Sequence, residues 1–392
     1  MKKIRFYTLP PLCLLLLFAS SCARLSADRT APAPSSAQAE TSPERAEETT
    51  AEKTPEFSAA PDPAAQGPLL ESTGDETDRT QEIAAALESS GGCRLGDGVF
   101  YVTNLKVGQD RSLAGSGIGR TELRMLSGAE GSAVSLGSRS SVRDLTLFGG
   151  ADAGSKENGG RNGVAWQGTY VSLSNTGTYP LRGQISNVLI HGFSGAGILC
   201  SNTSMLVSSG MNVMNVNVYD CWAGIEIRIL SEYHRFTNIQ IDKCTYGLIN
   251  NGGNNCFYNC GFSGNRTGIL MDNAENQSPN SAHGSFVGCT VNHSGKNTGE
   301  AVRIMGIRSG EVFSACQFFY GKIVVENSSG VHFNACNFGS DVTLTVDGEG
   351  QRAGMTLFSV CVFRSELPVT EKNGGLVIFT DCYLRDGTPF VR

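Results

Sequence analysis

The six residues FSACQF, Phe313 to Phe318, decide the fold, because close variants of them recur along the second half of the chain. These variants are FVGCTV from Phe286, FNACNF from Phe333, FSVCVF from Phe358 and FTDCYL from Phe379. The cysteines of the five Phe/Cys phrases lie 27, 20, 25 and 21 residues apart. Self-similarity at a period of about 20 to 30 residues is typical of proteins built from stacked structural repeats.

The pattern inside each phrase predicts two strands with a corner between them. Phe313 and Ala315 share one parity, whereas Cys316 and Phe318 share the other. Side chains of a strand alternate between its faces, so both sets lie inward only if the chain bends between them. Phe, Val, Ile, Thr, Asn and Gly dominate without a helical period, which disfavours a helical repeat. We therefore predict an all-β fold, a single-stranded parallel β-helix (solenoid), with the cysteines in one column about 4.8 Å apart.

The cysteine column is expected to begin before the five phrases, with His191, Cys221, Cys244 and Cys260 at the same corner. Apart from Cys13 and Cys22, the chain has eleven cysteines, and their spacing shows no paired metal-binding pattern. Buried thiols that act as small apolar side chains are one interpretation. Disulfides between stacked neighbours are the other, because one coil spacing lies within the Cα separation of about 4.4–6.8 Å that a disulfide permits.

The amino-terminal segment predicts export and a lipid anchor. Residues 1–22 have a basic start and a short apolar run, which indicate a signal peptide rather than a membrane-spanning helix. Ala19-Ser-Ser-Cys22 resembles the bacterial lipobox, which implies lipidation of Cys22 and attachment to the cell envelope, at the outer membrane if the organism has one. An ordinary cleaved signal with a coincidental cysteine is the alternative. Residues 23–67, rich in Ala, Pro, Glu and Thr, are expected to form a disordered tether, and 68–392 the folded domain.

Composition limits the classes of partner. The net charge is −6 and no basic run is present, which argues against a nucleic-acid partner. The 48 glycines suit corners and the 19 phenylalanines suit interior stacking. The folded segment is long enough for one continuous core.

The folded segment opens with an amphipathic helix. Asp78 or Thr80 is expected to cap it, its apolar positions include Ile83 and Leu87, and the Gly91-Gly92 pair ends it. Two strand-like stretches and a glycine-rich turn follow. This order of residues resembles the amino-terminal entry of the pectate-lyase superfamily, the rhamnogalacturonase/epimerase type. The matching residues are Asp78, Thr80, Ile83, Ala86, Leu87, Gly91, Gly92, Leu113, Gly115, Gly117, Thr121 and Leu123.

The resemblance implies a right-handed parallel β-helix whose amino-terminal helix caps the first coil. It also implies a polysaccharide partner that lies along the strands following the third corner. In this chain those strands are GIEIRI, GLINN, GILMD, AVRIM and IVVEN. Outward residues on or beside them are candidates for the site: Glu226, Arg228, His234 and Asp272 as catalytic groups, and Tyr233, Arg235 and Arg303 as substrate-binding groups.

Two reactions would use such a cluster. A lyase needs a strong base beside a uronate and a cation to stabilise the developing charge. Glu226 and Asp272 could offer oxygens to Ca²⁺, although two carboxylates fall short of a full shell. A hydrolase needs two carboxylates about 5 to 9.5 Å apart. The motifs of polygalacturonase-type and uronan-epimerase members are absent, and His283, His293 and His332 are expected in loops or at the surface.

The sequence therefore predicts a surface-tethered protein that binds a uronic-acid-containing polysaccharide and possesses lyase or hydrolase activity if it is an enzyme. A non-catalytic adhesin or a structural scaffold is the alternative, because one fold carries many functions.

Overall fold

The computed structural model describes residues 66–150, 157–166, 183–201, 208–273, 282–292, 299–308, 310–348 and 355–391. All of them belong to one compact unit, Ala59–Arg392. The predicted signal peptide with Cys22, and the tether up to residue 65, lie outside the described residues. Within the described ranges no helix has the length and apolar character needed to cross a membrane.

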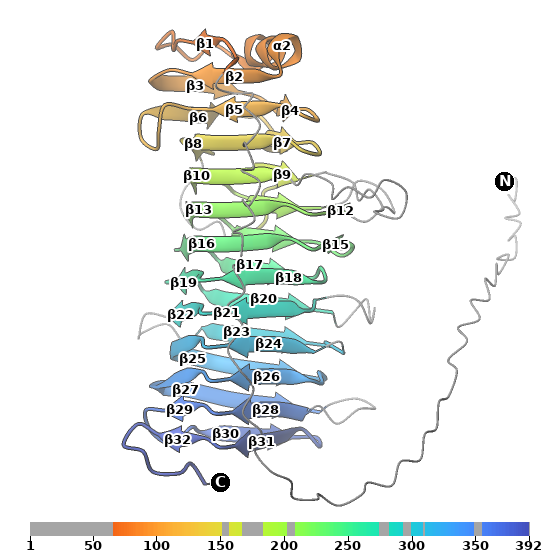
Figure 1. Ribbon diagram of the computed structural model, residues 1–392, viewed down its shortest axis with the longest axis vertical. Helices are drawn as coiled ribbons and strands as arrows, with labels where there is room; N and C mark the ends of the chain where they lie inside the picture. Colours follow the sequence, from red (N-terminus) through yellow and green to blue (C-terminus); the bar gives the residue numbers. More distant parts are fainter. Residues whose placement is uncertain are drawn as a thin grey trace, which may run out of the picture. The chain divides into compact units, whose positions relative to one another are not determined.

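The chain winds into stacked coils whose strands pair in parallel, each with the strand one coil further on (Figure 1). Each coil has three faces, A, B and C, and two of them are often carried by one bent strand. The bent strands joining A to B are β8 Ser141–Phe148, β10 Gln184–His191, β13 Asn212–Tyr219 and β16 Arg235–Asp242. Those joining B to C are β25 Gln317–Glu326 and β27 Asn337–Asp347. This arrangement confirms the predicted parallel β-solenoid.

The remaining strands each lie on one face. Face A also contains β1 Leu69–Leu70, β2 Gly92–Leu95, β5 Ser112–Ala114, β18 Asn255–Tyr258, β21 Gly284–Val287, β24 Glu311–Ser314, β26 Val331–Asn334, β28 Met355–Ser359 and β31 Leu376–Thr380. Face B contains β3 Gly98–Val102, β6 Thr121–Met125, β19 Gly261–Ser263, β22 Thr290–Asn292, β29 Val362–Phe363 and β32 Tyr383–Leu384. Face C contains β4 Leu105–Val107, β7 Ser132–Leu136, β9 Asn162–Trp166, β11 Ala196–Cys200, β14 Ala223–Ile227, β17 Tyr246–Asn250, β20 Thr267–Asp272, β23 Glu300–Met305 and β30 Val369–Lys372. A separate pair, β12 Ser208–Ser209 and β15 Ser231–Glu232, lies outside the three faces.

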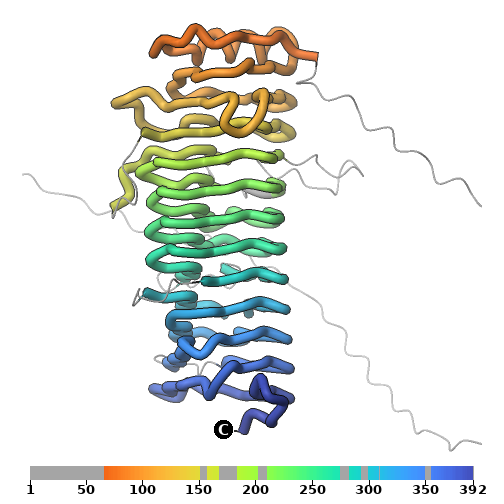
Figure 2. Tube along the Cα trace, turned by 90° about the vertical axis from the view of Figure 1, so that its left-hand side faces the viewer, coloured from red at the N-terminus to blue at the C-terminus, as the bar shows by residue number. Residues whose placement is uncertain are grey.

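The Phe/Cys phrases form the corner between faces A and B, as their parity switch predicts. The residue before the cysteine has a positive φ, for example 53° at Ala315 and 51° at Ala335, and this left-handed residue turns both flanking sets inward. The phenylalanines stack from coil to coil, with ring centroids 4.9 Å apart between Phe313 and Phe333. Each thiol then reaches a carbonyl of the previous coil, as Cys336 does at the oxygen of Phe313 (3.3 Å). The successive coils are visible as evenly stacked turns in Figure 2.

The prediction that Cys221, Cys244 and His191 belong to the column of Cys260 is wrong. The registers of β16 with β18 and β19 place Cys260 beside Ile239, at the corner between faces A and B. Cys221 and Cys244 follow the last residues of β13 and β16, so they lie at the corner between faces B and C. His191 is the last residue of β10 and stacks on neighbouring rings. The corner at which a cysteine lies depends on how its coil pairs with the next one. Similarity between short stretches of sequence does not reveal that pairing.

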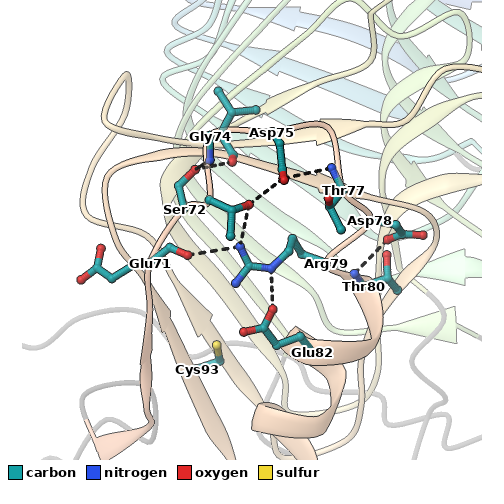
Figure 3. Close-up of polar contacts among 12 residues, drawn as sticks. Glu71, Ser72, Gly74, Asp75, Thr77, Asp78, Arg79, Thr80, Glu82 and Cys93 are labelled. Atoms are coloured by element: carbon teal, nitrogen blue, oxygen red, sulfur yellow. Dashed lines mark hydrogen bonds and ion pairs between the residues drawn. The ribbon is translucent and has the colours of Figure 1, made fainter.

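The amino-terminal end is covered by helix α2, Thr80–Ser90, as predicted (Figure 1). Ile83 and Leu87 are buried against the first coil. Asp78 accepts a hydrogen bond from the first helical N–H, Thr80 (2.9 Å), and Gly91 ends the helix with a φ of 76°. Arg79, almost fully buried, pairs with Glu82 and donates to the carbonyl of Glu71 (3.2 Å), which ties α2 to the segment before it (Figure 3).

The opposite end also has a cover, which the sequence did not reveal. After β32 the chain turns back, so that Pro389 pairs with Tyr383 in an antiparallel bridge. The ring of Phe390 then packs on Phe363 (4.6 Å) and Phe379 (4.8 Å), the rings of the last two coils. This shields the end of the phenylalanine stack from solvent.

Candidate functional site

The structure separates the seven candidate residues into three places. Glu226 and Arg228 project outward from face C and pair with each other, with 2.9 Å between Oε1 and Nε. Arg303, three coils further on, pairs with Glu300 (2.6 Å) and Glu326 (2.8 Å). Although burial opposes it, the two carboxylates raise the pKa of Arg303 above its usual value. These outward charges are therefore largely engaged with one another.

Glu226 and Asp272 do not form a cation site. The register places Glu226 opposite Ile249 and then Leu270, so Asp272 belongs to the neighbouring outward column and lies two coils away. Across the part of the chain that the structure describes, no group of three or more His, Cys, Asp and Glu side chains suits a metal ion. The donor set that Ca²⁺ needs is thus not assembled here.

His234 lies inside the solenoid, so the expected outward position is wrong. Its ring is fully buried, Nδ1 accepts the backbone N–H of Met211 (3.1 Å), and Nε2 is 2.8 Å from the hydroxyl of Ser231. Because Nδ1 accepts, the ring is neutral and its proton is on Nε2, where it is donated to Ser231. The inward position of His234 follows from the backbone at Tyr233. Its φ of 59° interrupts the regular alternation of side chains, so that Tyr233 points outward and His234 inward.

Tyr233 and Arg235 line a groove of about 620 Å³, beside the corner where face C turns into face A. We call it the basic groove. Its lining consists of Tyr233, Arg235, Asn254, Cys256, His283, Gly284, Arg308, Gly310, Val312, Ser329, Gly330 and His332. Two arginines and two histidines are among these residues, and none is Asp or Glu. The groove is therefore a locally cationic place on a chain with a net charge of −6.

Successive coils supply the groove residues at fixed intervals. Arg235, Cys256, Val312 and His332 belong to one outward column of face A, set by the pairing of β16, β18, β21, β24 and β26. One coil separates neighbours in this column by about 4.8 Å. The groove thus runs along the stacking direction of the coils, as an extended polymer would require.

Hydrogen bonds hold several groove side chains in place. Arg235 donates from Nη1 to the carbonyls of His234 (3.2 Å) and Asn254 (3.1 Å). Nε2 of His283 lies 3.1 Å from Oδ1 of Asn254, and since that oxygen only accepts, Nε2 carries a proton. Among the described residues, Nδ1 of His283 has no hydrogen-bond partner. Asn254 also donates to Glu232 (3.4 Å), the neighbour of Tyr233 in sequence.

A buried carboxyl lies directly behind the groove. Glu311 stands between the lining residues Gly310 and Val312, yet its side chain points inward and is 0% exposed. Neither of its oxygens has a hydrogen-bond partner among the described residues. Burial raises the pKa of Glu311 well above its usual value, by more than the nearby N–H of Val312, which does not meet hydrogen-bond geometry, lowers it. Burial therefore favours the neutral acid form of this side chain.

Face C carries a second, apolar cluster on its outer side. It joins Leu199 and Ile249 with the half-buried Trp222 and Tyr246. The two aromatic rings meet edge to face with centroids 5.4 Å apart. This cluster occupies the outward columns that hold Glu226 and Arg303 in other coils.

The sequence does not reveal the groove as a unit, because its residues come from separate coils. His283 and His332 were expected in loops or at the surface, and both are half-buried in the lining. Three of the groove residues stand a few positions before a Phe/Cys phrase: His283 before Phe286, Arg308 before Phe313, and His332 directly before Phe333. Alignment of the phrases with their upstream residues is the signal that would have identified them.

No family model matches the chain, and no curated protein matches its sequence. Solved structures do match. Tailspike protein 2 from Escherichia coli O157:H7 bacteriophage CAB120 has a TM-score of 0.52 and 16% identity, over 77% of this chain and 45% of the tailspike. This chain thus spans under half the length of that protein. The catalytic domain of a GH87 alpha-1,3-glucanase in complex with nigerose has a TM-score of 0.51 and 13% identity, over 85% of this chain and 70% of the glucanase. Together with the described coils, these similarities confirm the predicted right-handed parallel β-helix fold.

Proposed function

We propose that this chain is a polysaccharide-binding β-helix displayed on the cell envelope, and that the basic groove holds the carboxylates of a uronic-acid-containing glycan. One observation carries the proposal: the groove gathers Arg235, Arg308, His283 and His332 without an acidic lining residue, on an acidic chain. The lipobox-like sequence before Cys22 supports the display.

The chemistry of the groove suits carboxylates on a sugar polymer. A guanidinium presents a planar fork of donors that matches a carboxylate with two hydrogen bonds. Tyr233 exposes 41% of its surface and offers a ring on which the apolar side of a sugar can pack. The groove runs across several coils, so a chain of sugars meets the same kind of donor repeatedly. The GH87 glucanase with the same fold was solved with the sugar nigerose, which supports a carbohydrate ligand.

Lyase activity is the second candidate, because the groove contains a possible base. Nδ1 of His283 has no hydrogen-bond partner among the described residues, but it is shielded from solvent in the present ring orientation. To remove the proton next to a uronate carboxylate, the half-buried ring would have to turn this nitrogen toward the groove, while Arg235 stabilises the charge that develops. A hydrolase with paired carboxylates is not supported, since the described lining has none.

The test compares an acidic with a neutral glycan on the purified full chain. We expect polygalacturonate to bind and dextran not to bind in calorimetry, with affinity falling as salt rises. The double variant Arg235→Gln, Arg308→Gln should lose at least ten-fold in affinity, whereas Arg266→Gln, an exposed arginine at another corner, should not. Equal binding of both glycans, or an unaffected double variant, would overturn the proposal.

Activity is read in the same samples. A lyase leaves an unsaturated sugar that absorbs in the ultraviolet, and His283→Gln should remove that signal while binding persists. Binding without any product from either glycan would identify a non-catalytic adhesin. If the wild-type chain neither binds nor cleaves either glycan, the scaffold interpretation remains.

A further inference from the structure

One thiol of the chain differs from the others in its surroundings. The structure describes eleven free cysteines, of which ten are buried and only Cys256 is partly exposed. The buried thiols donate to backbone carbonyls inside the solenoid, as Cys316 does to Phe286 and Ser314 (3.4 Å each). Hydrogen bonds between neighbouring thiols raise the pKa of Cys316 and lower those of Cys289 and Cys361, and all three side chains are shielded from solvent. Such thiols react only when the coils open.

Cys256 instead belongs to the lining of the basic groove. The parallel register places Arg235 on one side of it and Ser285 on the other, each one strand away. The hydroxyl of Ser285 donates to its sulfur (3.4 Å). Tyr258, which stands on the same face of β18, also contacts it, and hydrogen bonding with Cys256 raises the pKa of Tyr258. The sulfur thus lies in the groove lining beside Arg235 and accepts a hydrogen bond from Ser285, where a small ligand can reach it.

We propose that Cys256 is a modification site, at which the groove selects small disulfides that carry carboxylates. The thiol gives its proton to water, and the thiolate attacks one sulfur of the disulfide. The old S–S bond breaks as the new one forms, and the second half leaves as a thiolate. No further oxidant is needed, because the incoming disulfide is the oxidised partner.

The selection follows from the charges beside the thiol. Arg235 and Arg308 raise the local concentration of anions, so an anionic disulfide meets Cys256 more often than a neutral one does. After exchange, the carboxylates of the bound half remain beside the same arginines. The adduct then occupies the place proposed for the glycan, so exchange closes the groove and reduction reopens it. Only this last consequence rests on the proposed function.

The experiment uses the purified full chain and two probes, a bis-nitrobenzoate disulfide with two carboxylates and an uncharged dipyridyl disulfide. Mass-spectrometric mapping should find Cys256 modified first, and Cys256→Ser should lose the fast phase. Each reaction rate is divided by the rate of a short peptide thiol with the same probe. For wild type at low ionic strength, this relative rate should be about ten-fold higher for the anionic probe than for the uncharged one, and salt should remove the difference. Arg308→Gln should reduce the preference, and Arg266→Gln should leave it unchanged.

Two results would overturn the proposal: mapping that finds another described cysteine modified before Cys256, or equal relative rates for the two probes. The mapping is done on wild type, so it decides even if Cys256→Ser folds poorly. The thiol readout requires no glycan and stays informative if polygalacturonate fails to bind. If polygalacturonate binds equally well before and after modification, groove closure is wrong while the exchange site stands.

Discussion

Replacement of Glu311 by methionine should make the protein more stable, although it removes the carboxyl group that lies behind the groove. Glu311 is fully buried, and neither carboxyl oxygen has a hydrogen-bond partner among the described residues. A buried polar group left unsatisfied costs about 1–3 kcal/mol. Methionine is similar in length, apolar and adaptable, so it fills the space beside Val331 without leaving a cavity.

The stability that Glu311→Met gains over the wild type should increase with pH. A glutamate in the unfolded chain loses its proton near its ordinary pKa of about 4.3. In the folded chain burial holds the pKa of Glu311 well above that value, so the unfolded state releases its proton first. The wild type therefore loses about 1.4 kcal/mol of stability per pH unit between the two pKa values. The Glu311→Met variant has no such loss, since methionine does not titrate.

The measurement is urea unfolding, followed by circular dichroism, at about pH 4, just below the unfolded pKa, and at about pH 7, well above it. We expect the free energy of unfolding of Glu311→Met to be larger than that of the wild type at both pH values. The difference should be greater at about pH 7. Glu366→Met, at an exposed glutamate, is the matched control and should not change the pH dependence. A variant that is less stable than wild type, or a difference that is constant with pH, would show that the carboxyl has a favourable partner.

Three further predictions test the core and the anchor. His234→Phe should lower the free energy of unfolding by about 1–3 kcal/mol, because Met211 N–H and the Ser231 hydroxyl lose their partner, and a denaturant titration checks this. Phe257→Leu and Phe358→Leu each interrupt the ring stack and should destabilise similarly in thermal unfolding, but only Phe257→Leu, inside the coils of the groove, should weaken polygalacturonate binding in calorimetry. Cys22→Ser should move the protein from the membrane to the soluble fraction, as detected by immunoblot; retention in the membrane would argue against lipidation.

The fold could be predicted from sequence because one physical constraint recurs in every coil. Two adjacent inward sets of opposite parity require a bend, and the structure places a left-handed residue there, even where it is Val360 with a φ of 55°. The cysteine column was only partly predictable. Cys221, Cys244 and Cys260 lie in similar stretches of sequence. The corner at which each of them lies depends on how many residues separate it from the preceding corner. That count becomes known only when the pairing between coils is seen.

The site was harder to predict, because it depends on which way single residues turn. His234 was expected outward but lies inward, next to Tyr233 with its positive φ, and no composition rule predicts a left-handed tyrosine. Tyr233 and Arg235 do lie in the groove, whereas Glu226, Arg228, Asp272 and Arg303 lie on face C. Their roles toward a substrate stay predictions. The groove also needs His283, Arg308 and His332, which are distant in sequence and meet only through stacking.

The groove and the phenylalanine stack use opposite sides of the same strands. In β18 and β21, Cys256 and Ser285 point outward while their neighbours Phe257 and Phe286 stack inward with centroids 4.6 Å apart. The parallel backbone ladder sets the strand spacing, the stacked rings fill the interior at the same spacing, and the distance between groove side chains is thereby fixed before any ligand arrives. A ligand then meets donors that need little ordering, which lowers the entropic cost of binding. In a solenoid each coil contacts only its neighbours, so a defect in the stack should reach the groove only from the coils that form it.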